Sequence, residues 1–140
     1  ADSCRVVLDR RFLIEEALDA VKAEVIGLLD ELTQRRPNFR YEIRDVMEFI
    51  PTMTEKDAPV VQAIASGIRA VLGKEPEYVI SPGTYDQKHI VRIGHLQECI
   101  AYGPGILDLA HQPDEYIVID DLVNSAKVMA HATLKLLGIA

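Results

Sequence analysis

The order of hydrophobic and polar residues predicts a mixed series of strands and helices. Two short runs have patterns that are typical of strands. The run at 5–12 (RVVLDRRF) contains β-branched residues, and the run at 39–49 (FRYEIRDVMEF) alternates between large and charged side chains. Between them, residues 15–34 place apolar side chains at three- and four-residue spacing, as one face of an amphipathic helix requires. Residues 1 to about 50 are therefore predicted to fold as strand, helix and strand.

The rest of the chain alternates predicted helices with short apolar runs. Helices are predicted at 57–73, 84–94 and 120–138, where periodic apolar positions end at a glycine. The predicted N-caps are Asp57, Thr84 in a capping box with Gln87, and Asp120. Short apolar runs that resemble strands lie at 77–81, 98–102 and 116–119. This alternation predicts an α/β fold class with a parallel sheet.

Residues 50–56 resemble a linker, because Pro51 stands among polar residues there. We therefore predict two lobes, residues 1–52 and 53–140. The first lobe supplies only two strands and one helix. A two-stranded sheet is marginal by itself, so this lobe is expected to depend on further contacts.

Composition narrows the classes of function. The chain has 22 acidic and 15 basic residues and a net charge of −7, which disfavours a nucleic-acid partner. No apolar run approaches the roughly 18 residues of a membrane span. Cys4 and Cys99 form no CxxC pair, which suits a reducing compartment and predicts a cytoplasmic location. The chain lacks an initiator Met and enters a predicted strand at once, which suggests a piece of a longer protein.

Candidate chemistry concentrates in residues 101–122. A turn of Gly103, Pro104 and Gly105 indicates irregular backbone, and His111 follows on the same loop. His111 and Glu115 have the i, i+4 separation of some metal ligands, but no metal-ligand motif is complete. On spacing alone, a single histidine is more often a surface or hydrogen-bonded residue than a ligand, so both interpretations stay open.

Two segments resemble the C-terminal signature of the zinc-dependent aminoacylase and carboxypeptidase family. They are residues 103–122 (GPGILDLAHQPDEYIVIDDL) and 82–90 (PGTYDQKHI). That family includes succinyl-diaminopimelate desuccinylase, acetylornithine deacetylase and the glutamate carboxypeptidases. The resemblance implies that residues 1–52 are the second half of a ferredoxin-like, α+β lid that dimerises. It also implies that residues 53–140 are the C-terminal, α/β part of a phosphorylase/hydrolase-like zinc exopeptidase domain.

The same resemblance implies roles for individual residues. His111 corresponds to a histidine that binds one of two zinc ions, with cobalt or manganese as alternative metals. Gly83 and Thr84 match a turn that holds the substrate's carboxylate. Arg11 matches an arginine at the end of a lid strand, where a guanidinium can grip a carboxylate with two parallel hydrogen bonds. Tyr85 departs from the family, which more commonly has a small residue there. The other metal ligands and the general base do not occur in this chain.

The leading hypothesis is therefore a fragment of a di-metal amide hydrolase, either a deacylase or an exopeptidase. Its substrates would be N-acyl amino acids or small peptides, and its parent protein would be a cytoplasmic homodimer. The fragment by itself is expected to be inactive. The alternative is a non-catalytic α/β module for dimerisation or partner binding, which would act through the exposed strand of the first lobe.

Overall fold

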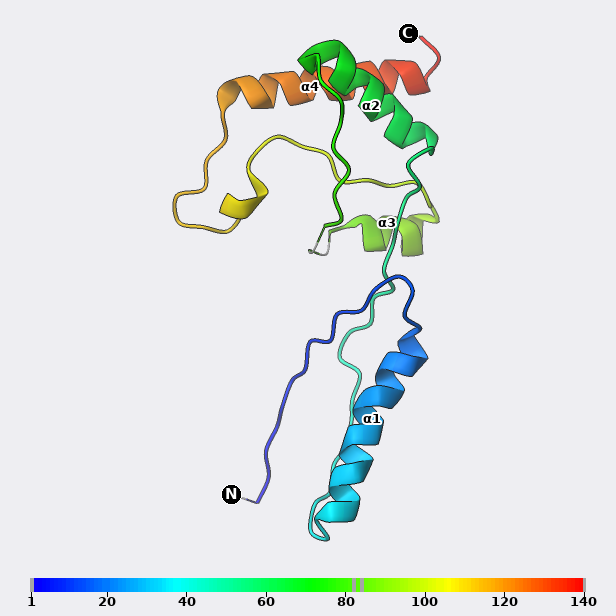
Figure 1. Cartoon of the computed structure of the whole chain (residues 1–140), viewed down its shortest axis with the longest axis vertical. Coiled ribbons are helices and arrows are strands. Elements are labelled where there is room, and N and C mark those ends of the chain that lie inside the picture. The colour runs from blue at the N-terminus through cyan, green and yellow to red at the C-terminus, as the bar shows by residue number, and fades with distance from the viewer. Residues whose placement is uncertain (1, 82, 84, 140) are drawn as a thin grey trace. The chain divides into compact units, whose positions relative to one another are not determined.

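A computed structural model describes residues 2–81, 83 and 85–139. Along these residues lie α1 (Leu18–Arg35), α2 (Pro59–Leu72), α3 (Gln87–Gly94), the 3₁₀ turn η1 (Leu107–Leu109) and α4 (Ile119–Leu136), shown in Figure 1. The chain divides into two compact units, Ala1–Thr52 and Met53–Ala140. Their identity as parts of a lid and of a catalytic domain stays a prediction. No described helix is long and apolar enough to cross a membrane.

The predicted α/β fold class is wrong for the described residues, which are helical or irregular and contain no β-strand. Neither the ferredoxin-like half-lid nor the sheet of a phosphorylase/hydrolase-like domain is present in them. The predicted strands were 5–12, 39–49, 77–81, 98–102 and 116–119. A strand persists only where a neighbouring strand receives its backbone hydrogen bonds, and alternation of side chains does not supply that neighbour. The last of these runs instead leads into α4, which already includes Ile119.

The helices themselves were predicted well, but their N-caps were not. Ala58 and Val118 are the N-cap residues of α2 and α4, and neither makes a side-chain capping bond. Asp57 therefore does not cap α2, whose first turn instead begins with Pro59, a residue whose fixed φ suits that position. Asp120 lies inside the first turn of α4, where its negative charge interacts favourably with the positive end of the helix dipole.

Unit 1 consists of α1 and the two irregular segments before and after it (Figure 1). Val21 is the buried residue of α1. Polar contacts attach both segments to α1: the Arg10 guanidinium donates to Glu24 Oε2 at 3.4 Å, and the Tyr41 hydroxyl donates to Asp30 Oδ1 at 2.6 Å. Because so little apolar surface is buried, we infer that these side-chain contacts hold the irregular segments against α1.

The contact between α1 and residues 45–48 is expected to weaken in acid. Lys22 Nζ donates to Asp45 Oδ2 at 3.0 Å and also to Glu48, and the bond from Lys22 lowers the pKa of Asp45 below its usual 3.8. A carboxyl with a lowered folded-state pKa contributes stability above its unfolded pKa and loses it as the pH falls through the folded value. The expected loss therefore falls below pH 3.8, and it is small because these groups are exposed.

This loss can be measured by amide hydrogen exchange of residues 45–48 as a function of pH. The Lys22→Gln variant should lack the acid-dependent step, since its amide cannot discriminate between the ionised and protonated carboxyl as an ammonium does. An identical step in both proteins would contradict the assignment to this ion pair.

Unit 2 is built on the packing of α2 against α4 (Figure 1). The buried positions of these helices carry mostly small side chains, which allow close approach. They include Val61, Ala63, Ala65, Val128 and Ala132. At Gly67 the two helices lie close together: a Cβ atom there would lie 2.8 Å from the carbonyl oxygen of Val128. The two helices therefore fit only because this position has no side chain.

Candidate functional site

His111 lies on a tight turn that follows η1. Its φ is +64°, in the left-handed region, which costs a residue with a side chain about 1 kcal/mol or more. The turn is closed by the Gln112 N–H, which donates to the Leu109 carbonyl oxygen at 3.0 Å. His111 is exposed, and no described residue forms a hydrogen bond or ion pair with its imidazole. The turn therefore presents the ring to solvent.

Glu115 holds this turn in place, a role that the sequence analysis missed. Its Oε2 accepts a hydrogen bond from the His111 backbone N–H at 3.0 Å. The i, i+4 spacing of the two residues was the visible signal, but it resembled the spacing of paired metal ligands. In the structure the spacing lets a carboxylate satisfy the backbone of a strained turn, so Glu115 positions His111.

The described residues do not complete a metal centre. They contain no group of three or more His, Cys, Asp or Glu side chains placed to hold one ion. The exposed imidazole of His111 suits zinc as a single donor, whereas a structural or catalytic zinc site needs at least three protein ligands. His111 thus fits one position of a centre whose other ligands the described part of the chain does not provide.

The predicted carboxylate-binding turn precedes α3. Gly83 is exposed and its N–H donates to Ser81 Oγ at 3.1 Å, while Thr84 lies outside the described residues. Gln87 begins α3, and its side-chain amide donates to the Cys99 carbonyl oxygen at 2.7 Å. The predicted capping box of Thr84 and Gln87 depends on Thr84 and so falls outside the described residues.

Thr54 also forms hydrogen bonds with the backbone of Cys99. Its hydroxyl donates to the Cys99 carbonyl oxygen at 2.8 Å and accepts from the Cys99 N–H at 3.1 Å. The backbone of Cys99 thus links the entry to unit 2, the start of α3 and the segment after α3. This junction fixes where α3 begins and hence where the Gly83 turn lies.

Arg11 and Arg10 differ in their contacts and exposure, and the substrate-binding role of Arg11 stays a prediction. Arg10 is hydrogen-bonded to Glu16 at 2.9 Å and to Glu24 at 3.4 Å, so its guanidinium holds unit 1 together. The Arg11 side chain is 73% exposed, with Nε 3.9 Å from Asp9 Oδ2. Arg11 is the more accessible of the two for a ligand.

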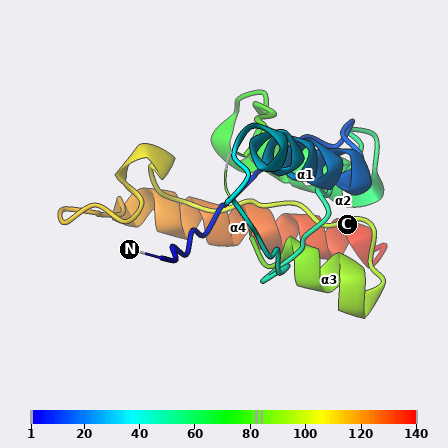
Figure 2. The same cartoon turned by 90° about the horizontal axis from the view of Figure 1, so that it is seen from below.

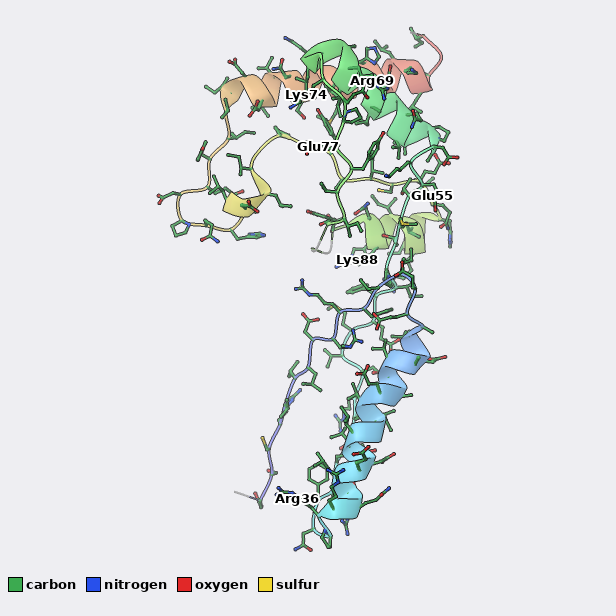
Figure 3. All side chains as sticks on the ribbon, viewed as in Figure 1. Arg36, Glu55, Arg69, Lys74, Glu77 and Lys88 are labelled. Atoms are coloured by element: carbon green, nitrogen blue, oxygen red, sulfur yellow. The ribbon has the colours of Figure 1, made fainter. Side chains whose placement is uncertain are left out.

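The structure does not gather the predicted site residues of unit 2 into one cluster. In both views, η1 and the turn after it lie apart from α3 (Figures 1 and 2). A groove of about 370 Å³ lies between the end of α2, the Gly-Pro-Gly turn and the first turns of α4, and neither His111 nor Gly83 lines it. Lys74 and Glu77, which are labelled in Figure 3, are among the residues that line this groove.

Comparison with known proteins places this chain among hydrolases. A match to peptidase family M20/M25/M40 covers residues 3–135. The acetylornithine deacetylase of Myxococcus xanthus is 30% identical over 136 residues, which cover 97% of this chain and 34% of that protein. The succinyl-diaminopimelate desuccinylase of Marinobacter nauticus is 28% identical over 135 residues, covering 96% of this chain and 34% of that protein.

A third relative has another acyl group in its name. The N-formyl-4-amino-5-aminomethyl-2-methylpyrimidine deformylase of Bacillus subtilis is 28% identical over 141 residues, covering 92% of this chain and 33% of that protein. The chain spans about a third of the length of these curated relatives. No solved structure matches it. Since the family match covers nearly the whole chain, this chain belongs to peptidase family M20/M25/M40.

Proposed function

We propose that this chain is part of a metal-dependent amide hydrolase that acts on N-acyl amino acids or small peptides. Family membership and the deacylase names of the relatives support this class of reaction. The structural observation that supports this proposal is His111. Its imidazole is exposed, its backbone has a positive φ, and its N–H donates to the Glu115 carboxylate. Backbone conformations of this kind cluster at functional sites.

His111 is proposed to bind one of two zinc ions, with cobalt or manganese as alternative metals. When bound, such ions lower the pKa of water and polarise the carbonyl of the scissile amide. The role of this chain is to hold the imidazole at the correct place, and Glu115 does so by accepting the His111 N–H. The remaining ligands and the general base would come from the rest of the longer protein.

The substrate's carboxylate is proposed to lie at the Gly83–Thr84 turn of unit 2. Arg11 of unit 1 is proposed separately as a substrate-binding residue. The start of α3 suits an anion, because a helix N-terminus carries partial positive charge. α3 contains Lys88 and Arg92 and no acidic residue within its bounds, whereas its N-cap residue is the acidic Asp86. Figure 3 labels Lys88 on the first part of α3.

Unit 1 is proposed to contribute to a homodimer, in a protein located in the cytoplasm. Its two irregular segments expose apolar side chains that a monomer would normally cover. The exposed fractions are between 69% and 77% for Val6, Val7, Leu8, Val46 and Met47. The same surface is the observation in favour of the alternative, a non-catalytic unit that binds a partner.

The test is hydrolysis of N-acetyl and N-succinyl amino acids by the full-length protein that contains this chain. We expect turnover that is lost on treatment with a chelator and restored by Zn²⁺. Residues 1–140 alone should be inactive, because they supply a single predicted ligand. Full turnover by the metal-free protein, or no turnover on any N-acyl amino acid with metal bound, would contradict the proposal and favour the partner-binding alternative.

A further inference from the structure

The groove beside the Gly-Pro-Gly turn has acidic side chains that no basic side chain neutralises. Its charged lining residues are Lys74, Glu75, Glu77 and Asp121. Glu75 is already paired, because Arg69 Nε donates to its two carboxylate oxygens at 3.0 and 2.9 Å. Glu77 and Asp121 form no ion pair with any described residue. Two unpaired carboxylates against the single ammonium of Lys74 therefore give the groove an excess of negative charge.

Ser125 is the one buried residue among those that line this groove, and its hydroxyl has no partner. The residue is 3% exposed, and no described residue forms a hydrogen bond with its Oγ. The hydroxyls of two other helical residues, Thr33 and Thr133, donate to the carbonyl oxygen four positions earlier, at 3.1 and 2.8 Å. Ser125 does not make the equivalent bond to Asp121. Because buried hydroxyls are normally hydrogen-bonded, an unpaired one in the lining of a groove indicates where a polar group of a ligand binds.

The rest of the lining is largely apolar and half-buried. Ile68 and Leu72 contribute from the last turns of α2, together with Pro76, Tyr102 and Pro104. The groove's volume of about 370 Å³ lies near the lower end of the range for small-molecule sites, roughly 300–1,000 Å³. A ligand that matches this lining combines a short apolar stem with a positively charged head.

The acceptors in the groove favour an ammonium group over a metal ion. A primary ammonium has three N–H donors, and two carboxylates and a hydroxyl offer three acceptors. A metal centre is disfavoured, since the described residues contain no group of three His, Cys, Asp or Glu side chains placed to hold an ion. We propose that the groove binds a small organic cation whose primary ammonium group contacts Glu77, Asp121 and Ser125. Its apolar stem lies along Ile68 and Leu72.

The test is a calorimetric titration of the full-length protein with n-butylammonium and, in parallel, with 1-butanol, which has the same stem and no charge. Butylammonium should bind at least tenfold more tightly than butanol. Asp121→Asn should weaken butylammonium binding about tenfold, the effect expected when a hydrogen bond to a charged group is lost. Ser125→Ala removes a neutral acceptor and should weaken it about fivefold.

Asp120→Asn is the matched control for Asp121→Asn. Asp120 lies in the same first turn of α4 and has the same favourable interaction with the helix dipole, but it does not line the groove. This variant should keep the wild-type affinity for butylammonium. His111→Ala should keep it too, because neither His111 nor Gly83 lines the groove. Circular dichroism verifies that each variant folds, and Ser125→Ala decides the question if Asp121→Asn does not.

The inference goes beyond the proposed function and does not rest on it. Equal binding of butanol and butylammonium, or no binding of either, would overturn it. Wild-type affinity in folded Asp121→Asn or Ser125→Ala would do the same, as would equal weakening by Asp120→Asn. Loss of binding in His111→Ala would place the amine at the proposed metal site instead. Hydrolysis of N-acyl amino acids is measured separately, and its failure would contradict the proposed function while leaving the amine site intact.

Discussion

Replacing His111 with alanine is expected to lower turnover of the full-length protein about a thousandfold. A metal ion stabilises a hydrolytic transition state by several kcal/mol, and each 1.4 kcal/mol or so is a factor of ten in rate. Loss of one ligand should release or displace an ion. The measurements are kcat on an N-acyl amino acid and the zinc content of the purified variant. Both should fall together.

His95 provides the matched control for this substitution. It has the same left-handed backbone conformation, with a φ of +55° against +64° for His111, and it is also exposed. It forms the C-cap of α3, where the resemblance assigns it no role in catalysis. His95→Ala should therefore retain both zinc and turnover. A His111→Ala protein with full turnover and full zinc content would defeat the proposed role of His111 as a metal ligand, whatever His95→Ala does.

The Gly67→Ala substitution is expected to destabilise unit 2 by about 2 kcal/mol. The added methyl would lie 2.8 Å from the carbonyl oxygen of Val128 and 3.1 Å from its Cγ1. The nearest of these atoms belongs to the backbone of a helix, so relief requires α2 and α4 to separate. Overpacking of this kind typically costs 1–3 kcal/mol, which outweighs the gain of up to about 1 kcal/mol in helix propensity.

Gly27→Ala tests the opposite case in α1. No atom lies within 4 Å of the Cβ position at Gly27, so only the propensity gain of about 1 kcal/mol remains and the variant should be stabilised. Hydrogen exchange of α2 and α4 amides for Gly67→Ala, and of α1 amides for Gly27→Ala, measures each effect within its own unit. Stabilisation of unit 2 by Gly67→Ala would show that the α2–α4 contact is looser than the structure indicates.

The sequence predicted helices better than strands because the two kinds of structure depend on different information. The apolar spacing of residues 15–34 is local, and α1 forms within a few residues of that range, at Leu18–Arg35. The run at 39–49 alternates equally clearly, but a strand needs a partner from elsewhere, and pairing leaves no mark on the run itself. Tyr41 instead directs its hydroxyl to Asp30 of α1.

The candidate site was predictable in part for the same reason. Gly103, Pro104 and Gly105 indicated irregular backbone before His111, and the structure places His111 on an exposed turn. The bond between Glu115 and the His111 N–H depends on backbone torsions. Torsions of irregular segments do not follow from residue spacing, so this contact emerged only with the fold.

The junction at Cys99 has a consequence for how this part of the chain can vary. Thr54 and Gln87 both bind the main-chain atoms of Cys99, and its thiol takes no part in those bonds. Substitution of Cys99 by residues with side chains of similar size should therefore be tolerated. Loss of the hydroxyl at 54 would leave the Cys99 N–H without its partner, and loss of the amide at 87 would remove one of the two donors to the Cys99 carbonyl oxygen. The constraint therefore falls on two residues that lie 45 and 12 positions from Cys99 in the sequence.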